Sequence, residues 1–111
     1  MKNPQFLMVH TKKESRFITE EDISACIANG NYTQIILSNK EEFTISKKLK
    51  SVEEKLNKSE FVRIHHSHII NIQHLEKYNN SGNQKVTLRN GIELEVSKRK
   101  KADFLARFKS F

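Results

Sequence analysis

Four histidines are the residues whose types and spacing most directly suggest chemistry at one place in this chain. His65, His66 and His68 are close neighbours, and His74 follows six residues after the last of them. In an extended strand His66 and His68 would share a face, which is the minimum geometry for two zinc ligands. A metal site needs further ligands, and residues 64–74 contain no Asp, Glu or Cys. Histidines that form hydrogen bonds are therefore the first interpretation, and a His-based metal site is the weaker alternative.

Other catalytic patterns are missing. Ser67 stands beside histidines, but the orienting carboxylate of a catalytic triad cannot be inferred from sequence neighbours. Glycine occurs only at positions 30, 82 and 91, so neither G-x-G-x-x-G nor a P-loop fits. The single Cys26 lies in the alternating apolar stretch 23–28 and is predicted to be a small buried core residue. We expect no enzymatic activity and no cofactor.

Basic side chains are concentrated near the C-terminus. The 111 residues carry 20 Lys and Arg against 13 Asp and Glu, a net charge of +7. Residues 84–111 hold 8 basic and 3 acidic side chains, and the densest run is Lys98, Arg99, Lys100 and Lys101. Such a run suits neutralisation of phosphates, so we expect nucleic acid as the partner, ahead of an anionic membrane surface. No apolar stretch approaches the roughly 20 residues of a membrane span, and we expect a cytoplasmic protein without a membrane partner.

The elements that must position these residues are mostly short strands. Segments rich in β-branched and aromatic residues are separated by Asn, Gly and charged turns, which predicts a mainly β protein. The predicted strands are 6–10, 15–19, 23–28, 32–37, 42–45, 61–64, 72–78, 85–88 and 92–96. The turn at 29–31 predicts a tight hairpin, and Asn90 with Gly91 is the strongest two-residue hairpin signal.

Two short amphipathic helices complete the pattern. Ser46 is predicted to cap a helix over 47–57, and Ser97 to cap a last helix. Their apolar faces are formed by Leu49, Val52 and Leu56 in the first helix and by Phe104, Leu105 and Phe108 in the second. A helix-turn-helix needs a turn of about 3–4 residues between its helices, whereas a long run of strands separates these two. Any DNA contacts must therefore come mainly from loops and strand ends.

Residues 61–71 resemble the most characteristic motif of LytTR DNA-binding domains. They read Phe-Val-Arg-Ile-His-His-Ser-His-Ile-Ile-Asn, which fits F-x-R-x-H-x-S with two apolar residues and Asn after it. Further matches follow the family's order: its A-x-x-N-Y turn at 28–32, its short helix at Lys47-Lys48-Leu49 with Leu56, its N-G hairpin at 90–91 and its V-S-R-R segment at 96–99. The resemblance covers about residues 5–108, and coincidence is a poor explanation for separated motifs in the right order.

The resemblance implies a fold and a function. It implies an elongated antiparallel β sandwich of small stacked sheets with one or two short helices. Family members act mostly as C-terminal output domains of bacterial response regulators in two-component systems. Sequence-specific binding of double-stranded DNA at promoter direct repeats, through successive major grooves, is implied. We expect residues 1–111 to be one such domain, acting alone or joined to a receiver domain in a longer chain, and paired repeats would allow a dimer on DNA.

The resemblance also implies which residues contact DNA. The first contact loop is the hairpin with Asn29, Asn31 and Tyr32. The central contacts, mainly to the DNA backbone, are His65, His66, Ser67 and Asn71. The second contact loop, at the start of the last helix, opens with Arg99 and Lys98 beside it. The neighbouring Ser97, Lys100 and Lys101 are further candidates, from the helix start and the basic run.

The chemistry of these side chains suits such roles. Arg99 can bond bidentately to guanine O6 and N7, which makes it the best candidate for base readout. Asn31 and Asn71 offer a donor and an acceptor, while Ser67 and His65 suit phosphate oxygens, which fix register without reading sequence. At Ser97 the N-terminal amides of a helix can bind another phosphate.

Several of these residues have a simpler alternative role. Asn31 can serve turn geometry alone, and Tyr32 can pack at the edge of the core. Asn71 can bond neighbouring backbone at a strand end, and Lys100 and Lys101 can simply face solvent. Phe61, Ile64, Ile69, Ile70 and Phe104 are predicted to be core residues only.

Two positions depart from the family pattern. Many relatives have Arg at the positions of His66 and Lys98. Lysine is a point charge, so phosphate attraction at position 98 should survive better than bidentate recognition. Histidine titrates near pH 6.5, which raises the hypothesis that DNA affinity strengthens below about that pH through His66. Equal affinity at pH 6 and pH 8 for wild type and His66→Ala would remove that hypothesis.

The main alternative function is RNA binding by a β module. An RRM-like platform exposes a pair of aromatic side chains on adjacent strands, and the expected absence of such a pair argues against RNA binding. Competition between duplex DNA and single-stranded RNA separates the two functions.

Overall fold

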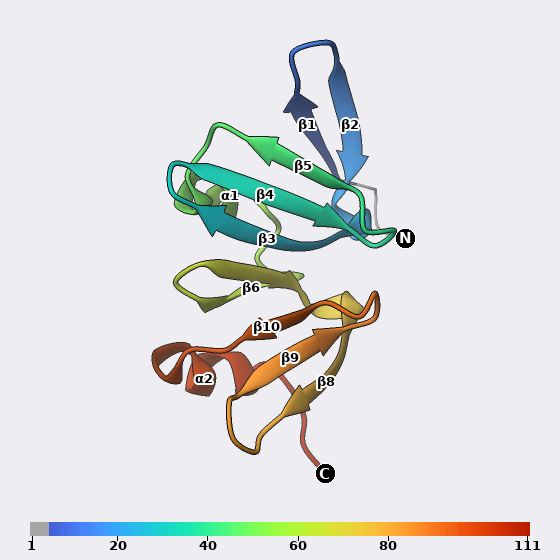
Figure 1. Cartoon of the computed structure of the whole chain (residues 1–111). Coiled ribbons are helices and arrows are strands. Elements are labelled where there is room, and N and C mark those ends of the chain that lie inside the picture. Colours follow the sequence, from blue (N-terminus) through green and yellow to red (C-terminus); the bar gives the residue numbers. More distant parts are fainter. Residues whose placement is uncertain (1–4) are drawn as a thin grey trace.

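The computed structural model describes residues 5–111, in which all strand pairings are antiparallel (Figure 1). The strands are β1 (Phe6–His10), β2 (Ser15–Thr19), β3 (Ile23–Asn29), β4 (Tyr32–Leu37), β5 (Glu42–Ile45), β6 (Phe61–His65), β7 (His68–Asn71), β8 (Leu75–Asn79), β9 (Lys85–Leu88) and β10 (Glu93–Glu95). The α-helices are α1 (Leu49–Lys55) and α2 (Lys98–Leu105), and the short 3-10 helices are η1 (Glu20–Asp22) and η2 (Ile72–His74).

Three sheets follow one another along the longest of the three dimensions, 46 × 37 × 24 Å. The β1–β2 ribbon projects at one end, the sheet with strand order β5-β4-β3-β7-β6 lies in the middle, and the sheet β10-β9-β8 lies at the other end (Figure 1). The mainly β fold of small stacked antiparallel sheets, predicted from the sequence, is therefore confirmed.

The middle sheet carries a hydrophobic core on each face. On β3, Cys26 belongs to the core beside α1, whereas its neighbour Ala25 belongs to the core beside α2. On β7, Ile69 and Ile70 divide in the same way. Successive side chains of a strand point to opposite faces, so strands buried on both faces are apolar at nearly every position. This burial raises the pKa of the Cys26 thiol to about 12, as expected for an inert core cysteine.

The five residues predicted to belong only to the core are all buried, with exposed fractions of 5% or less. They are Phe61, Ile64, Ile69, Ile70 and Phe104.

The structure corrects three predicted elements. Residues 68–71, not predicted as a strand, form β7, which pairs with both β3 and β6. Residues 72–78, predicted as one strand, begin with η2, because the Asn71 side chain accepts from Gln73 N and bends the chain. The first helix begins at Leu49 after Lys48, and Ser46 forms no cap.

Both glycine turns are present. Gly30 has φ 62° in the β3–β4 turn, where glycine supplies the positive φ that side chains disfavour. Gly91 has φ 91°, but its loop spans residues 89–92 between β9 and β10, which is longer than the predicted two-residue turn. Within residues 5–111, neither helix has the length and apolar character that crossing a membrane demands.

Candidate nucleic-acid interface

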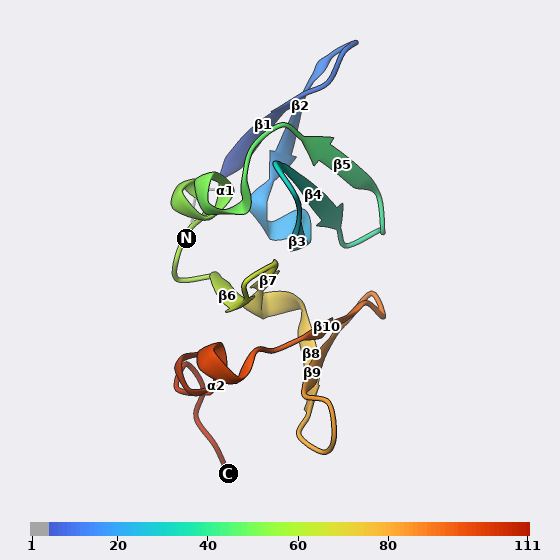
Figure 2. The same cartoon turned by 60° about the vertical axis from the view of Figure 1, so that its left-hand side comes forward.

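Strand direction brings the predicted contact segments to one edge of the molecule. In the order β5-β4-β3-β7-β6 with antiparallel neighbours, the C-terminal ends of β3, β5 and β6 must lie at the same edge. That edge carries the β3–β4 turn, the β5–α1 connection and the β6–β7 turn, and the β10–α2 connection lies below them on the same side (Figure 1). We call these segments, residues 29–32, 46–48, 65–68 and 97–101, the loop edge. Figure 2 shows α1, the β6–β7 hairpin and α2 in succession along the long dimension.

The β3–β4 turn presents polar side chains to solvent. Asn29, Asn31 and Tyr32 are exposed, with Tyr32 51% accessible. The positive φ of the turn belongs to Gly30, whereas Asn31 is not in the left-handed region. Among residues 5–111 no hydrogen bond holds the Asn31 side chain, so its amide is available to a partner.

The β6–β7 turn is internally organised. Ser67 N donates to His65 Nδ1 at 3.0 Å, and Ser67 O accepts from Ala28 N at 2.9 Å, which ties the turn to the end of β3. The His65 and His68 rings stack with centroids 4.4 Å apart, while the His66 side chain is exposed.

His68 links the middle sheet to the end sheet. Its Nδ1–H donates to the Glu95 carbonyl oxygen at 3.0 Å. Burial, and the positive charge that His65 can carry, lower the pKa of His68 more than the bond to Glu95 raises it. The neutral form of His68 is therefore favoured, and the ring acts as a donor to backbone.

Asn71 lies away from the loop edge. Its side chain is 1% exposed, its amide donates to Ile23 O at 3.0 Å and to Glu20 O, and its oxygen accepts from Gln73 N at 2.9 Å. All its polar atoms are used within the protein, so the predicted DNA contact is corrected to the alternative, bonding of neighbouring backbone at a strand end.

The start of α2 has a formed cap. Ser97 Oγ accepts from Lys100 N at 3.2 Å, and Ser97 N donates to Ile64 O at 2.9 Å, which fixes the helix start to β6. Lys98 and Arg99 are exposed, whereas Lys100 and Lys101 are half-buried. The opposite side of the helix is anchored by Phe104, which is 1% exposed. Its ring meets Tyr78 and Phe108 edge to face.

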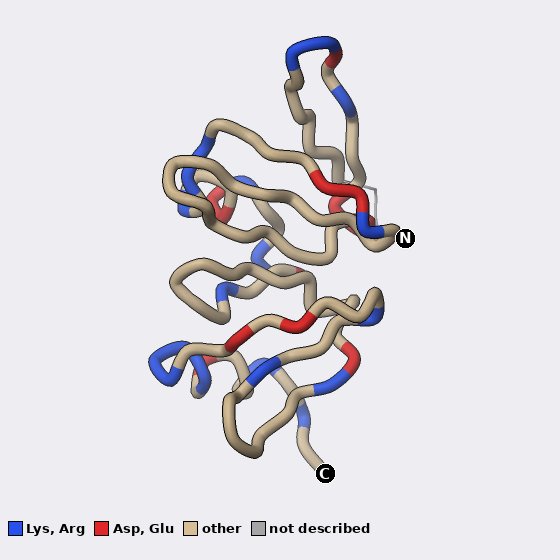
Figure 3. The backbone as a smooth tube through the Cα atoms, viewed as in Figure 1, with Lys and Arg blue, Asp and Glu red and all other residues tan. Residues whose placement is uncertain are grey.

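The contact segments predicted from the sequence do not include the β5–α1 connection. Lys47 and Lys48 are exposed there, and Thr33 Oγ1 donates to Lys47 O at 2.7 Å, which fixes the connection beside β4. Figure 3 shows basic positions at this connection and at the start of α2, and a run of acidic positions at the opposite edge, at the start of β5, besides those on α1 and β10. A net charge of +1 over residues 1–60 hid this asymmetry, which only the fold separates in space. The Lys47-Lys48 pair was the available signal.

The structure bears on the two alternative functions, a metal site and RNA binding. Among residues 5–111, no three His, Cys, Asp or Glu side chains come together in a geometry that would hold a metal ion. An exposed aromatic pair on adjacent strands, expected to be absent, is present: Phe6 on β1 and Phe17 on β2 are 60% and 68% exposed. Its expected absence therefore no longer excludes RNA binding.

Comparisons with known proteins agree with this geometry. The family model described as LytTr DNA-binding domain matches residues 6–109. A similar solved structure is the LytTr DNA-binding domain of a putative methyl-accepting/DNA response regulator from Bacillus cereus, with a TM-score of 0.81 and 19% identity. The match covers 92% of this chain and 94% of that one, and it shows a shared fold. No curated protein matches the chain. The resemblance found in the sequence is confirmed, and the chain belongs to the LytTR DNA-binding domain family.

Proposed function

We propose that the loop edge binds double-stranded DNA sequence-specifically and that the chain regulates transcription through this contact. The observation that carries the proposal is the shared edge: the β3–β4 turn, the β6–β7 turn and the start of α2 lie on one side, where a single duplex can touch all three (Figure 1). The β3–β4 turn and α2 occupy successive major grooves, and the β6–β7 turn meets the backbone between them.

Each segment has a distinct role. Arg99 and Lys98 stand exposed on the first turn of α2, with Arg99 reading guanine through its two parallel donors. Asn31, with Asn29 and Tyr32 beside it, enters the other groove. His65, His66 and Ser67 contact phosphates, together with backbone amides in the first turn of α2. Lys100 and Lys101 lie further along the same helix and add to the positive potential.

The proposal extends to the arrangement of the DNA site and to the partners of the domain. Binding at direct repeats, by a pair of copies, follows the family's mode of action, as does service as the output domain of a response regulator. Selection of preferred sites from random duplex DNA tests both the class of ligand and the repeat, because a recovered repeat reports its own spacing. Competition with single-stranded RNA tests the alternative ligand, in which the exposed Phe6 and Phe17 would stack on bases.

Arg99→Ala is the sharpest mutational test of base readout. We expect a loss of about 1–3 kcal/mol at the selected site and relaxed preference at one base pair, since a bidentate contact discriminates by that amount. Affinity is measured for the selected site and for each single-base variant. The control is Arg89→Ala, an exposed arginine in the β9–β10 loop at the opposite edge (Figure 1). A loss that is equal for all sequences would reduce Arg99 to a phosphate contact.

The exposed position of His66 suits the proposed pH dependence. A protonated imidazole beside phosphate strengthens binding. The test is the DNA affinity of wild type and of His66→Ala, each measured at pH 6 and pH 8.

A further inference from the structure

We infer that Arg63 is a positioning residue for DNA binding, whose guanidinium holds the β6–β7 turn in its binding conformation while Glu53 of α1 holds the guanidinium. The inference rests on the proposed function, because the turn it positions is the central contact of the loop edge. It gives the arginine of the F-x-R-x-H-x-S segment a role within the protein itself.

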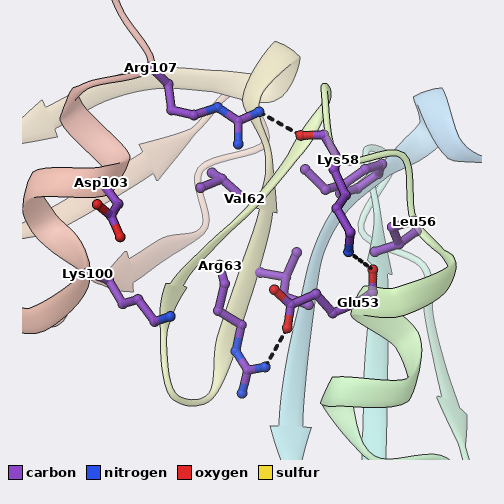
Figure 4. Close-up of a pocket in the computed structure, with 10 residues that line it drawn as sticks. Glu53, Leu56, Lys58, Val62, Arg63, Lys100, Asp103 and Arg107 are labelled. Carbon is purple, nitrogen blue, oxygen red and sulfur yellow. Dashed lines mark hydrogen bonds and ion pairs between the residues drawn. The ribbon is translucent and has the colours of Figure 1, made fainter.

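The hydrogen bonds of Arg63 are directed inward. Its Nε–H donates to His65 O at 3.1 Å, and one terminal nitrogen donates to His66 O at 2.5 Å. The other terminal nitrogen forms an ion pair with Glu53 Oε1 at 2.8 Å. Figure 4 shows Arg63 reaching from β6 to Glu53 on α1, at the side of a pocket of about 210 Å³ between α1, β6 and α2. The Arg63 side chain is only 19% exposed.

The sheet explains why the turn needs this support. Pairing of β6 with β7 is regular up to Arg63, and the register then shifts before His65 pairs with His68. A register shift disturbs the ladder and leaves carbonyl groups to find other donors. The planar guanidinium supplies parallel donors to two successive carbonyls, which a lysine ammonium cannot do.

Glu53 carries the restraint into the core. α1 is fixed by Leu49 and Val52, which are 3% and 5% exposed. The ion pair therefore ties the β6–β7 turn to α1, the helix that follows Lys47 and Lys48. The β6–β7 turn and the β5–α1 connection are thus held in a fixed position relative to each other. A site that is already ordered avoids the entropic cost of ordering when DNA binds.

Two variants separate positioning from direct contact. Arg63→Lys keeps the charge but loses the paired donors. We expect its affinity for the selected site to fall on the order of tenfold, because the β6–β7 turn must then be ordered when DNA binds. The affinity of Arg63→Ala for the selected site should fall by a similar factor, and its slope of log K against log salt should equal that of wild type. A phosphate contact would instead leave most affinity in the lysine variant and lower the slope by about one in the alanine variant, and that result would overturn the inference.

Glu53→Gln gives a prediction opposite in sign to simple electrostatics. Removing a negative charge should strengthen binding to a polyanion, but loss of the ion pair should weaken it. We expect weaker binding than wild type. The matched control is Glu54→Gln, the next and exposed residue of α1, which changes the charge equally and should bind at least as tightly as wild type.

Thermal unfolding of each variant shows that it is folded at the assay temperature. Equal or tighter binding by Glu53→Gln refutes the positioning role. Failure of wild type itself to bind duplex DNA would refute the proposed function instead, so the two failures are distinguishable.

Discussion

Asn71 and His74 show how polar residues serve the fold at the scale of single side chains. Asn71 bonds the carbonyls around η1, and His74 Nε2 donates to Glu21 O while its Nδ1 accepts from Ser24 Oγ at 3.0 Å. Both bring η1 and the start of β3 against the end of β7. Buried polar groups are tolerated when all their hydrogen bonds are made, and losing one partner exposes the full desolvation cost.

Replacing Asn71 tests this structural role. Asn71→Ala leaves Ile23 O and Gln73 N without their partner, so we expect the free energy of unfolding to drop by about 2–3 kcal/mol. The folded variant should keep its DNA affinity, as measured below its melting temperature. Asn80→Ala, at an exposed loop position, should change neither quantity. If Asn71→Ala had wild-type stability but did not bind DNA, Asn71 would be a DNA contact after all.

His68 predicts a pH dependence of stability. Its pKa is lower in the folded protein than in the unfolded chain, chiefly because of burial, so the unfolded state binds more protons. Its contribution to stability is complete above about pH 6.5, the usual histidine pKa, and is lost as the pH falls through the folded value. Urea unfolding at pH 7.5 and 5.5 should show a smaller decrease for His68→Asn, which keeps a donor near Nδ1, than for wild type.

His10→Asn on the exposed end of β1 is the control for this measurement and should retain the wild-type decrease. An identical decrease for His68→Asn would show that another group carries the pH dependence.

At the scale of elements, α2 is positioned by its cap and by one aromatic anchor. The helix has 8 residues, too few to be stable without tertiary contacts. Ser97 fixes its start to β6, and Phe104 packs into the core below the middle sheet. The exposed face with Lys98 and Arg99 is therefore oriented by residues that need not touch DNA.

Loss of the cap should destabilise this element. For Ser97→Ala we expect a decrease of about 1 kcal/mol in the free energy of unfolding, because the Lys100 amide loses its side-chain acceptor and keeps only the Ser97 carbonyl oxygen. Ser46→Ala is the matched control, since Ser46 forms no helix cap, and it should be nearly neutral in urea unfolding. Equal effects of the two substitutions would show that the cap bond contributes nothing.

At the scale of the whole molecule, the strand order separates charge. Acidic residues at the start of β5 and basic residues of the β5–α1 connection lie close in sequence but at opposite edges (Figure 3). A duplex bound along the loop edge, as proposed, would therefore meet Lys47 and Lys48 as well as the basic run of α2. Release of counterions makes such contacts visible in the salt dependence of binding.

Lys47→Ala with Lys48→Ala tests this surface. If each lysine neutralises one phosphate, the slope of log K against log salt should become shallower by about 2. The control pair is Lys12→Ala with Lys13→Ala, in the exposed β1–β2 turn. It makes the same charge change and should leave the slope unchanged. Equal slopes for both double variants would place the β5–α1 connection outside the interface.

Local pattern determined much of this protein from the sequence alone. Alternating apolar residues located most strands, Gly30 and Gly91 marked turns, and Ser97 marked the last helix, because each signal depends on nearest neighbours. The spacing of family motifs identified the fold and the candidate contact segments. These features need no knowledge of distant residues.

Tertiary structure alone decided the rest. β7 lies in a segment with polar residues at both ends, and its strand character comes from pairing with β3 and β6. Asn71 is buried against the Glu20 carbonyl, 51 positions away, and the ion pair of Arg63 depends on Glu53, 10 positions away. The strand order decides which basic residues lie at one edge. The physical reason is that a polar side chain has the same donors and acceptors in a site or in a core. Only the fold determines whether backbone or solvent meets them.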